Sequence, residues 1–426
     1  MTNWSTDPLK NLTTKIGSGA TPKGGKKSYK DEGISLIRSQ NVYNLKFERD
    51  GLAFIDEDQA ENLSHVQVEG KDVLLNITGH SVGRCCMVPD RILPARVNQH
   101  VMILRADPSR IDPRYLLYYV NSPDVKRGLL QRTHGATRDA LTKGQMEAFE
   151  VKYPPLSVQR RIADILGALD DKIELNRRMN ETLEAMAQAL YRHWFVDFGP
   201  FQDREFTDTE ELGPIPKGWE VKPIKEVVDM LGGSTPKTKV DEYWDGGNIT
   251  WFTPTDLTDQ DQLFLEHSDR QITEEGLNSC STNIFPPYSI MMTSRATVGV
   301  TAINRVEACT NQGFINIIPG DEVSLPQVYF WIDRMMHKIE ARADGSTYPE
   351  ISQRDFKPLP ILVAPSEDVE EYVRQSKELF SLIENNIVES ETLAETRDYF
   401  LPKLISGEIE VDAAQEIAED TVDAPA

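Results

Sequence analysis

The chain has 426 residues, of which 39% are hydrophobic, and its 68 acidic and 46 basic side chains give a formal net charge of −22. This length allows two or three domains with a full core, and no apolar run approaches the roughly 18 residues of a membrane span. The first residues hold neither a basic start nor an apolar stretch, so they predict no signal peptide, and we expect a cytoplasmic protein.

The acidic charge is unevenly distributed along the chain. Residues 1–155 hold 22 Lys and Arg against 18 Asp and Glu, whereas residues 366–426 hold 4 against 17. A DNA-binding surface needs basic groups, because neutralising phosphates supplies much of the affinity. The charge therefore disfavours DNA binding by the isolated chain, unless basic groups gather on one face or a basic partner supplies phosphate contacts.

Residues 1–155 predict a mixed domain, which we interpret as a recognition domain. Short apolar runs predict strands at Ile34–Ile37, 73–77 and 101–104, and Pro113 begins a helix through Val120. Polar loop residues can bond base edges or phosphates; a merely solvated loop is the alternative for each of them. The candidates for DNA contact are Lys23, Arg38, Ser39, Gln40, Asn41, His80, Arg84, Gln99, His100, Thr137 and Arg138.

Residues 156–198 predict one long helix. Its apolar side chains recur at alternating spacings of four and three, which is the period of a coiled coil over about five heptads. Alone, such a helix would leave its apolar stripe in water, so we expect a helical mate. The residues assigned to coiled-coil or partner contacts are Ile162, Leu166, Leu169, Ile173, Asn176, Leu183, Leu190 and Trp194.

A second domain follows a linker. Residues 199–218 hold three prolines and three glycines and are interpreted as the linker. Residues 219–365 repeat the order of the first domain, with strands at Ile249–Phe252, 289–292 and 314–318 and a helix at 326–342. The candidates for DNA contact here are Lys237, Thr253, Thr255, Arg295, Thr297, Gln312, Thr347 and Tyr348.

Residues 366–410 predict a second long helix, which we expect to pair antiparallel with the first. Asn176 and Asn386 fall on the two stripes, where buried asparagines fix the register of a coiled coil; exposed asparagines that happen to fall there are the alternative. Residues 411–426 are acidic and unpatterned, which predicts a disordered tail. The corresponding coiled-coil or partner residues are Leu379, Ile383, Asn386, Leu393, Phe400 and Leu404.

The two halves repeat one another at an offset of about 210–216 residues. The recurring pieces are Trp4 and Trp219, residues 19–23 and 233–237, residues 82–83 and 298–299, residues 98–99 and 311–312, and residues 135–137 and 345–347. This period is far longer than that of a solenoid repeat, so a whole domain and its helix are duplicated. We expect an α+β fold with two mixed domains, two long antiparallel helices and pseudo-twofold symmetry.

Three segments resemble catalytic motifs but lack the residues that carry the chemistry. The turn at 19–28 has Ala20 and Lys27 where a phosphate loop needs Gly and Ser or Thr, which leaves a basic turn near phosphates or a solvated loop. Residues 285–288 have Phe where a methyltransferase tetrad needs Asn or Asp. Glu69-Gly70-Lys71 lacks the partner carboxylates of a nuclease. The four cysteines and seven histidines show no metal spacing, so we expect neither catalysis nor a bound metal.

Three local patterns together resemble the specificity subunit of a type I restriction–modification enzyme. They are residues 155–163 (PLSVQRRIA) entering the first long helix, residues 190–198 (LYRHWFVDF) leaving it, and residues 401–409 (LPKLISGEI) near the end of the chain. The Gly-x-Thr-Pro turns are also typical of that family's recognition domains. The second helix departs from the pattern, because Pro365-Ser366-Glu367 lacks the Gln-Arg-Arg of the first.

The resemblance implies a non-catalytic subunit that recognises a bipartite double-stranded DNA target, one half-site per domain. The paired helices would set the gap between half-sites and dock two methyltransferase subunits, which endonuclease and translocase subunits would join. S-adenosylmethionine, ATP and magnesium would belong to those partners. The alternatives are a DNA methyltransferase or nuclease with a fused recognition region, and a coiled-coil scaffold without DNA contact.

Overall fold

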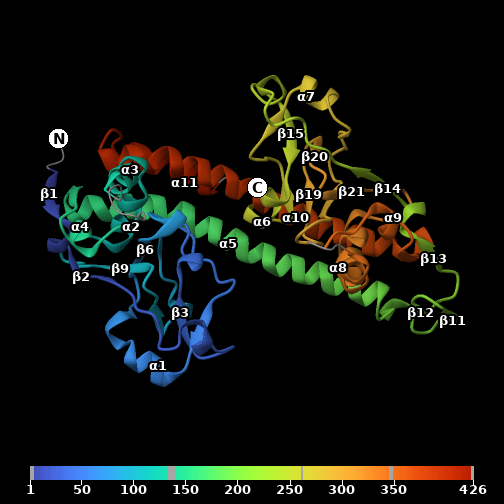
Figure 1. Ribbon diagram of the computed structural model, residues 1–426, viewed down its shortest axis with the longest axis horizontal. Coiled ribbons are helices and arrows are strands. Elements are labelled where there is room, and N and C mark those ends of the chain that lie inside the picture. Colours follow the sequence, from blue (N-terminus) through green and yellow to red (C-terminus); the bar gives the residue numbers. More distant parts are fainter. Residues whose placement is uncertain (1–3, 133–139, 261, 345–348, 424–426) are drawn as a thin grey trace. The chain divides into compact units, whose positions relative to one another are not determined.

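The computed structural model describes residues 4–132, 140–260, 262–344 and 349–423 (Figure 1). The chain forms two compact units, which we name the first unit (residues 1–175 and 390–425) and the second unit (residues 176–389). Two long helices, α5 (Leu156–Phe195) and α10 (Ser366–Ser406), contribute residues to both units.

The first unit is built on two four-stranded sheets. Its strands are β1 (Ser5–Pro8), β2 (Thr13–Ser18), β3 (Ile34–Ile37), β4 (Ala53–Ile55), β5 (Gln67–Val68), β6 (Val73–Asn76), β7 (Cys85–Met87), β8 (Ala95–Val97), β9 (Val101–Ala106) and β10 (Glu150–Tyr153). One sheet has the order β2-β9-β6-β7 and is antiparallel throughout. The other has the order β4-β3-β8-β5, with β3 and β8 parallel. β1 pairs separately with β10.

Short helices cover the antiparallel sheet of the first unit. They are α2 (Pro113–Asn121), α3 (Pro123–Gln131) and α4 (Lys143–Glu147), while α1 (Glu57–Asn62) follows β4. The Asp112 carboxylate caps α2 by accepting hydrogen bonds from the backbone N–H groups of Arg114 and Tyr115, and Pro113 at the first turn has no N–H to satisfy. Tyr115 and Leu116 pack into one core with Leu75 of β6 and Leu104 of β9.

The second unit repeats this order of elements. Its strands are β13 (Glu220–Pro223), β14 (Val228–Gly232), β15 (Ile249–Phe252), β16 (Phe264–Leu265), β17 (Gln271–Ile272), β18 (Ile290–Thr293), β19 (Thr301–Asn304), β20 (Ala308–Thr310), β21 (Phe314–Pro319) and β22 (Pro360–Val363). The sheets have the orders β14-β21-β18-β19-β16 and β17-β15-β20, and β13 pairs with β22 as β1 does with β10. The helices are α6 (Pro254–Gln260), α7 (Glu274–Asn278), α8 (Leu325–Arg342) and α9 (Gln353–Phe356). The six strands and two helices predicted for the two domains are confirmed, with bounds that differ by no more than two residues.

Within the first unit, α5 and α10 share an apolar seam. Ile162 and Leu166 of α5 are buried in the same core as Phe400 and Leu404 of α10. An Arg397–Asp170 ion pair of 2.7 Å also joins the two helices, and the Tyr118 hydroxyl of α2 donates to the same carboxylate at 2.6 Å. Leu169 and Leu393 are fully buried, whereas Ile173 is half-buried.

Within the second unit, the two helices meet through asparagines. Asn176 and Asn386 are 1% and 7% exposed. The Asn176 amide donates to the Glu389 carboxylate at 2.6 Å, and the Asn386 amide donates to Asn180 Oδ1 at 2.8 Å. Asn180 lies one turn after Asn176 on α5, but its partner Asn386 lies about one turn before Glu389 on α10. The two helices are therefore antiparallel. Because both side chains are buried, the alternative interpretation that these are exposed asparagines is excluded.

The aromatic end of α5 packs differently from the predicted stripe. Leu183, Leu190 and Trp194 are half-buried, as is Leu379 of α10, and the fully enclosed side chains of α5 are instead Ala187, Tyr191 and Phe195. Phe195 stacks edge-on against Tyr372 of α10 at 4.9 Å, and Ile383 lies in the same core. The reason is that residues of the sheet and of α8 in the second unit cover more of the α5 surface than a partner helix alone would. Tyr191, for example, also packs against Phe330 of α8.

The prediction of a disordered tail at 411–426 is wrong over most of its length, because Val411–Asp423 forms helix α11. Ala414 and Ala418, one turn apart, are buried against the first unit, and Arg161 of α5 forms an ion pair with Asp412. The linker at 199–218 is also ordered: β11 (Phe206–Thr209) and β12 (Gly213–Pro216) form a hairpin, and Phe201 and Ile215 join the core of the second unit.

Candidate nucleic-acid interface

Each unit carries the same turn, at the end of β2 in the first unit and of β14 in the second. Residues 19–23 follow β2, and residues 233–237 follow β14. A Cβ atom on Gly19 would lie 2.1 Å from the Val97 carbonyl oxygen, and one on Gly233 would lie 2.1 Å from that of Asn311. Only glycine allows this approach, which places the turn against the segment that joins two further strands.

The segment beneath the turn has the sequence Asn-Gln in both units. The Asn98 side-chain oxygen accepts a hydrogen bond from the His100 backbone N–H at 3.0 Å, and Asn311 does the same for Gly313 at 2.8 Å. These asparagines shape the bend, so that the glutamine between them and the next strand is exposed. The sequence repeat therefore encodes one backbone geometry twice.

A threonine of the turn binds that glutamine in both units. Thr21 Oγ1 donates to Gln99 Oε1 at 2.6 Å, and Thr235 Oγ1 donates to Gln312 Oε1 at 2.7 Å. Because the carboxamide oxygen is engaged, the amide nitrogen is the group of the glutamine that can donate to a ligand. Thr21 and Thr235 were not among the predicted contacts; their signal was the recurrence of Gly-x-Thr-Pro together with Asn-Gln.

In the first unit this pair extends into a longer chain of hydrogen bonds. Gln99 Nε2 lies 2.8 Å from His100 Nε2, and His100 Nδ1 lies 2.6 Å from Thr78 Oγ1. An amide nitrogen can only donate, so His100 Nε2 accepts and the Nδ1–H donates to the threonine hydroxyl. In the second unit Gly313 replaces His100, and no such extension is possible.

The neighbours that hold the turn differ between the units. In the first unit the Gln59 side chain bonds both the N–H and the carbonyl of Lys23, each at 3.1 Å. In the second unit two indole N–H groups hold the turn: Trp251 donates to the Ser234 carbonyl at 3.0 Å and Trp244 to the Lys237 carbonyl at 3.2 Å. The same turn position is thus maintained by unrelated side chains.

Exposed lysines surround the turn in both units. They are Lys23, Lys26 and Lys27 in the first unit and Lys237 and Lys239 in the second. Both predicted lysine contacts are therefore accessible to an anion. In the first unit His80 is also exposed, and the Arg84 guanidinium lies 4.5 Å from the centre of the Tyr43 ring.

The predicted cluster at residues 38–41 is mainly structural. Arg38 and Gln40 both donate to the Gly51 carbonyl, and Ser39 is half-buried. Asn41 is fully buried: its amide donates to the carbonyls of Glu48 and Asp50, and its oxygen accepts from the Arg38 N–H. The prediction that Asn41 contacts DNA is wrong, because both ends of its carboxamide hold the neighbouring loop.

The remaining predicted contacts of the second unit lie in two places. Thr253 bonds Asp256 at the start of α6 through its N–H and hydroxyl, both at 2.6 Å, while Thr255 is exposed. Arg295 and Thr297 are exposed in the loop after β18, and Arg295 lies 3.6 Å from the Glu350 carboxylate. The predicted residues Thr137, Arg138, Thr347 and Tyr348 lie outside the described residues.

Backbone pairing shows which loop positions correspond. Thr78 bridges Ala140 in the first unit, and Arg295 bridges Glu350 in the second. The same backbone position thus holds a threonine bound to His100 in one unit and an arginine paired with a carboxylate in the other. The framework is shared, and the side chains on it differ: Thr78 is half-buried, whereas Arg295 is exposed.

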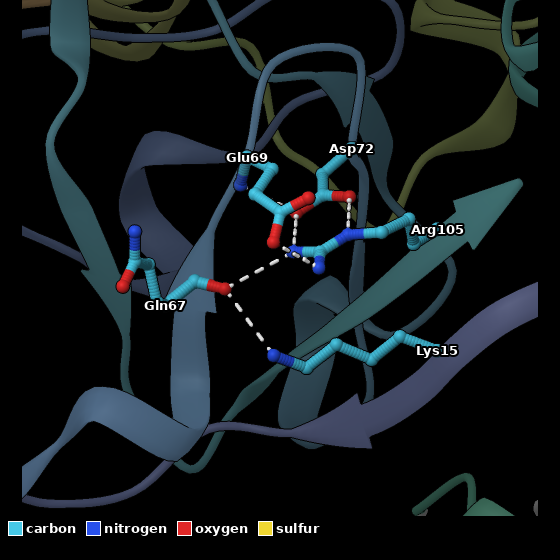
Figure 2. Close-up of polar contacts among 5 residues, drawn as sticks. All are labelled: Lys15, Gln67, Glu69, Asp72 and Arg105. Atoms are coloured by element: carbon cyan, nitrogen blue, oxygen red, sulfur yellow. Dashed lines mark hydrogen bonds and ion pairs between the residues drawn. The ribbon is translucent and has the colours of Figure 1, made fainter.

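The acidic motif at residues 69–72 is occupied by a structural ion pair. Asp72, which is fully buried, accepts two hydrogen bonds of 2.8 Å from Arg105, and Glu69 pairs with the same guanidinium (Figure 2). The hydrogen bonds that Arg105 donates to the Asp72 carboxylate raise the pKa of its guanidinium. Burial lowers the pKa of nearby Lys15, which donates to the Gln67 carbonyl at 3.2 Å. These carboxylates therefore join the segment between β5 and β6 to β9.

Neither the tetrad-like segment at residues 285–288 nor the thiol of Cys85 offers a reacting group. Phe285 is fully buried, and the Pro286 carbonyl accepts from Ser289 and Asn304 at 2.8 Å each, so this segment is a turn before β18. Burial raises the pKa of the Cys85 thiol to about 12, which disfavours a thiolate. Among the residues that the structure describes, no group of three or more potential metal ligands comes together.

A family model for the type I restriction modification DNA specificity domain matches residues 1–185 and 216–395. The chain belongs to this family. As a specificity subunit, it is a non-catalytic, DNA-binding component of a restriction–modification system, as the sequence resemblance predicted.

Curated relatives are also specificity subunits. The chain is 39% identical over 193 residues to the type I restriction enzyme MjaIX specificity subunit of Methanocaldococcus jannaschii, an alignment that covers 45% of this chain and only 44% of that protein. It is 24% identical over 437 residues to the HindI specificity subunit of Haemophilus influenzae, covering 88% of this chain and 94% of that protein. Among solved structures, the S subunit from M. genitalium has the same fold, with a TM-score of 0.56, 14% identity and coverage of 95% and 96% of the two chains.

Within the described residues, no helix of this specificity subunit combines the length and apolarity needed to cross a membrane. The cytoplasmic location expected from the sequence stays a prediction.

Proposed function

We propose that this specificity subunit recognises a bipartite DNA target, with one half-site for each unit. The observation that supports this most directly is the duplicated surface: turn, Asn-Gln bend and Thr–Gln hydrogen bond occur once per unit, each on its own core. A subunit that recognised one continuous site would need only one such surface. The differing side chains at Thr78 and Arg295 suit two half-sites of different sequence.

The long helices have the properties of a spacer and a docking surface. Each contributes to both units, and buried asparagines fix their register in the second unit. Exposed apolar side chains remain on them, including Met179 and Met186 of α5 and Leu382 of α10, which are 43–52% exposed. We propose that methyltransferase subunits dock on these helices and, with endonuclease subunits, carry S-adenosylmethionine, ATP and magnesium. Basic surfaces on such partners would offset the charge of −22.

The decisive experiment exchanges one recognition domain. We would replace residues 1–155 with the equivalent domain of another specificity subunit, express the chimera with its methyltransferase, and sequence the methylated positions of the host genome. The expected outcome is a motif with one new half-site and one unchanged half-site. A motif in which both halves change would overturn the assignment of one half-site to each unit.

The spacer is tested by lengthening both helices together. Seven residues inserted after Lys172 and seven after Glu391 preserve the heptad period and add about 10 Å at 1.5 Å per residue. We expect the unspecified gap to grow by roughly three base pairs at 3.4 Å each, with both half-sites unchanged. An unchanged gap would show that the helices do not set the spacing.

A coiled-coil scaffold without DNA contact, which the sequence left as an alternative, disagrees with the match to a DNA specificity domain. A gel-shift titration of the chain co-expressed with its methyltransferase separates it from the proposed function, because a scaffold would leave the complex with the DNA affinity of the methyltransferase alone.

A further inference from the structure

We propose that the Thr–Gln pair and its lysines form a phosphate clamp that each unit applies to the DNA backbone, independently of base sequence. We define the clamp as Thr21, Gln99 and Lys23 in the first unit and Thr235, Gln312 and Lys237 in the second. The proposal rests on the proposed function, since it assumes that both units contact duplex DNA. It adds the identity of the ligand group, a phosphodiester oxygen, and a role for the two threonines.

The first argument is that both units keep the same Thr–Gln hydrogen bond, although different side chains hold the turn in place. The hydrogen bond has nearly the same length in the two units, 2.6 and 2.7 Å. Yet Gln59 holds the turn in one unit and two tryptophans hold it in the other. Two half-sites of different sequence share their sugar–phosphate backbone and not their bases, so a group common to both units suits a backbone contact.

The second argument is the chemistry of the exposed atoms. The threonine hydroxyl occupies the carboxamide oxygen, so the glutamine presents N–H donors. In the first unit one of the two amide hydrogens of Gln99 is already donated to His100, which leaves the other for a ligand. Phosphate oxygens only accept hydrogen bonds, and side-chain amides and lysines are common donors to them. Two or three exposed lysines lie in the turn or just after it in each unit, although the second unit as a whole is acidic.

Thr21 and Thr235 are positioning residues in this clamp. Each fixes the rotamer of a long, exposed side chain that would otherwise lose conformational freedom on binding. Gly19 and Gly233 bring the threonine within reach by allowing the close approach of the turn. In this arrangement the threonine does not itself contact DNA.

The test uses the full chain in complex with its methyltransferase subunits and two labelled duplexes of unrelated sequence, followed by fluorescence anisotropy over a range of salt concentrations. Gln99→Ala and Gln312→Ala should each weaken binding of both duplexes by about three- to tenfold, equally for the two sequences. Lys23→Ala should reduce the slope of log affinity against log salt by roughly 0.9, whereas the glutamine variants should leave the slope unchanged.

Positioning by threonine is tested with a conservative pair of variants. Thr21→Val removes the hydroxyl at nearly constant shape and should reproduce the loss seen with Gln99→Ala, and Thr21→Ser should restore binding. Thr21→Val in the Gln99→Ala background should add no further loss, because the interaction it removes is already absent. A threonine that acts only on folding would produce additive losses.

Lys10→Ala is the matched control, since this exposed lysine of the first unit precedes β2 whereas Lys23 follows it. It should alter neither affinity nor salt slope. If the wild-type complex binds no duplex, including one that carries the motif methylated in the host genome, the proposed function fails. If it binds both and the glutamine variants bind equally well, or alter the methylated motif at one half-site, the phosphate clamp fails while the proposed function stands.

Discussion

The two units stabilise the start of the same strand with different chemistry. In the first unit, buried Asp72 precedes β6 and forms a bidentate ion pair with Arg105 of β9. In the second unit, Ser289 precedes β18, and its N–H donates to buried Asn304 at 2.9 Å in an uncharged network. The duplicated fold therefore accepts either an ion pair or an uncharged hydrogen bond at this buried position, while the exposed Thr–Gln pair is the same in both units. Retention at a surface, where packing demands little, is the pattern expected of a functional contact.

The largest effect should come from breaking the ionic network. Asp72→Ala should destabilise the first unit by about 3–5 kcal/mol, because Arg105 loses the carboxylate that compensates its partial burial. The corresponding Ser289→Ala removes the hydrogen bond from the Ser289 hydroxyl to the Pro286 carbonyl and should cost the second unit only about 1 kcal/mol, the value of one neutral hydrogen bond. Hydrogen exchange followed by mass spectrometry measures local stability in each unit separately. Equal losses would show that the two networks are energetically equivalent.

A smaller and symmetric effect should follow from the turn glycines. Gly19→Ala and Gly233→Ala each place a methyl group 2.1 Å from a backbone carbonyl oxygen, so the turn must move, at a cost of about 2 kcal/mol. Gly17→Ala is the matched control, since a Cβ there meets nothing within 4 Å. Exchange rates of the two turns report the change. Similar protection in Gly19→Ala and Gly17→Ala would contradict the close approach.

The ion pair between the linker and helix α10 should make the stability of the second unit depend on pH. Asp368 at the start of α10 accepts two hydrogen bonds of 2.6 Å from Arg204 and one of 2.8 Å from Trp219, and these lower its pKa. A lowered carboxyl pKa stabilises the folded state above the unfolded pKa of about 3.9, and this contribution is lost as pH falls through the folded value. Asp368→Asn should therefore flatten the decline in stability of the second unit below about pH 4. Parallel acid-unfolding curves for wild type and variant would refute this.

The smallest effect should come from the exposed ion pair between α5 and α11 in the first unit. Arg161 pairs with Asp412 of α11, but the Asp412 side chain is 82% exposed. Exposed pairs contribute little, so Asp412→Ala should change stability by no more than about 0.5 kcal/mol. Ala418→Asp, which puts a charge into the buried face of the same helix, should instead release α11, as detected by faster exchange of residues 411–423.

Much of the architecture could be predicted from the sequence, because the repeat and the heptad spacing are properties of chain order. Helix α11 was missed because its acidic composition indicates disorder, whereas its order depends on two small residues, Ala414 and Ala418, that fit against another part of the fold. Asn41 was misassigned because polarity does not reveal burial. Thr21 was visible in the repeat, but its partner Gln99 is 78 residues away, and only the folded structure brings them together.

The composition of the first unit affects the order in which the chain can fold during synthesis. Residues 390–423 supply six buried side chains, Phe400, Leu404 and Ala418 among them, to a core whose other buried members lie before residue 176. The ribosome makes those early residues first, yet they must wait for nearly the whole chain before their core can close, whereas the second unit is complete by residue 389. Domains made as one stretch usually fold as they emerge. For this chain, a truncation near the C-terminus would therefore damage the domain at the opposite end of the sequence.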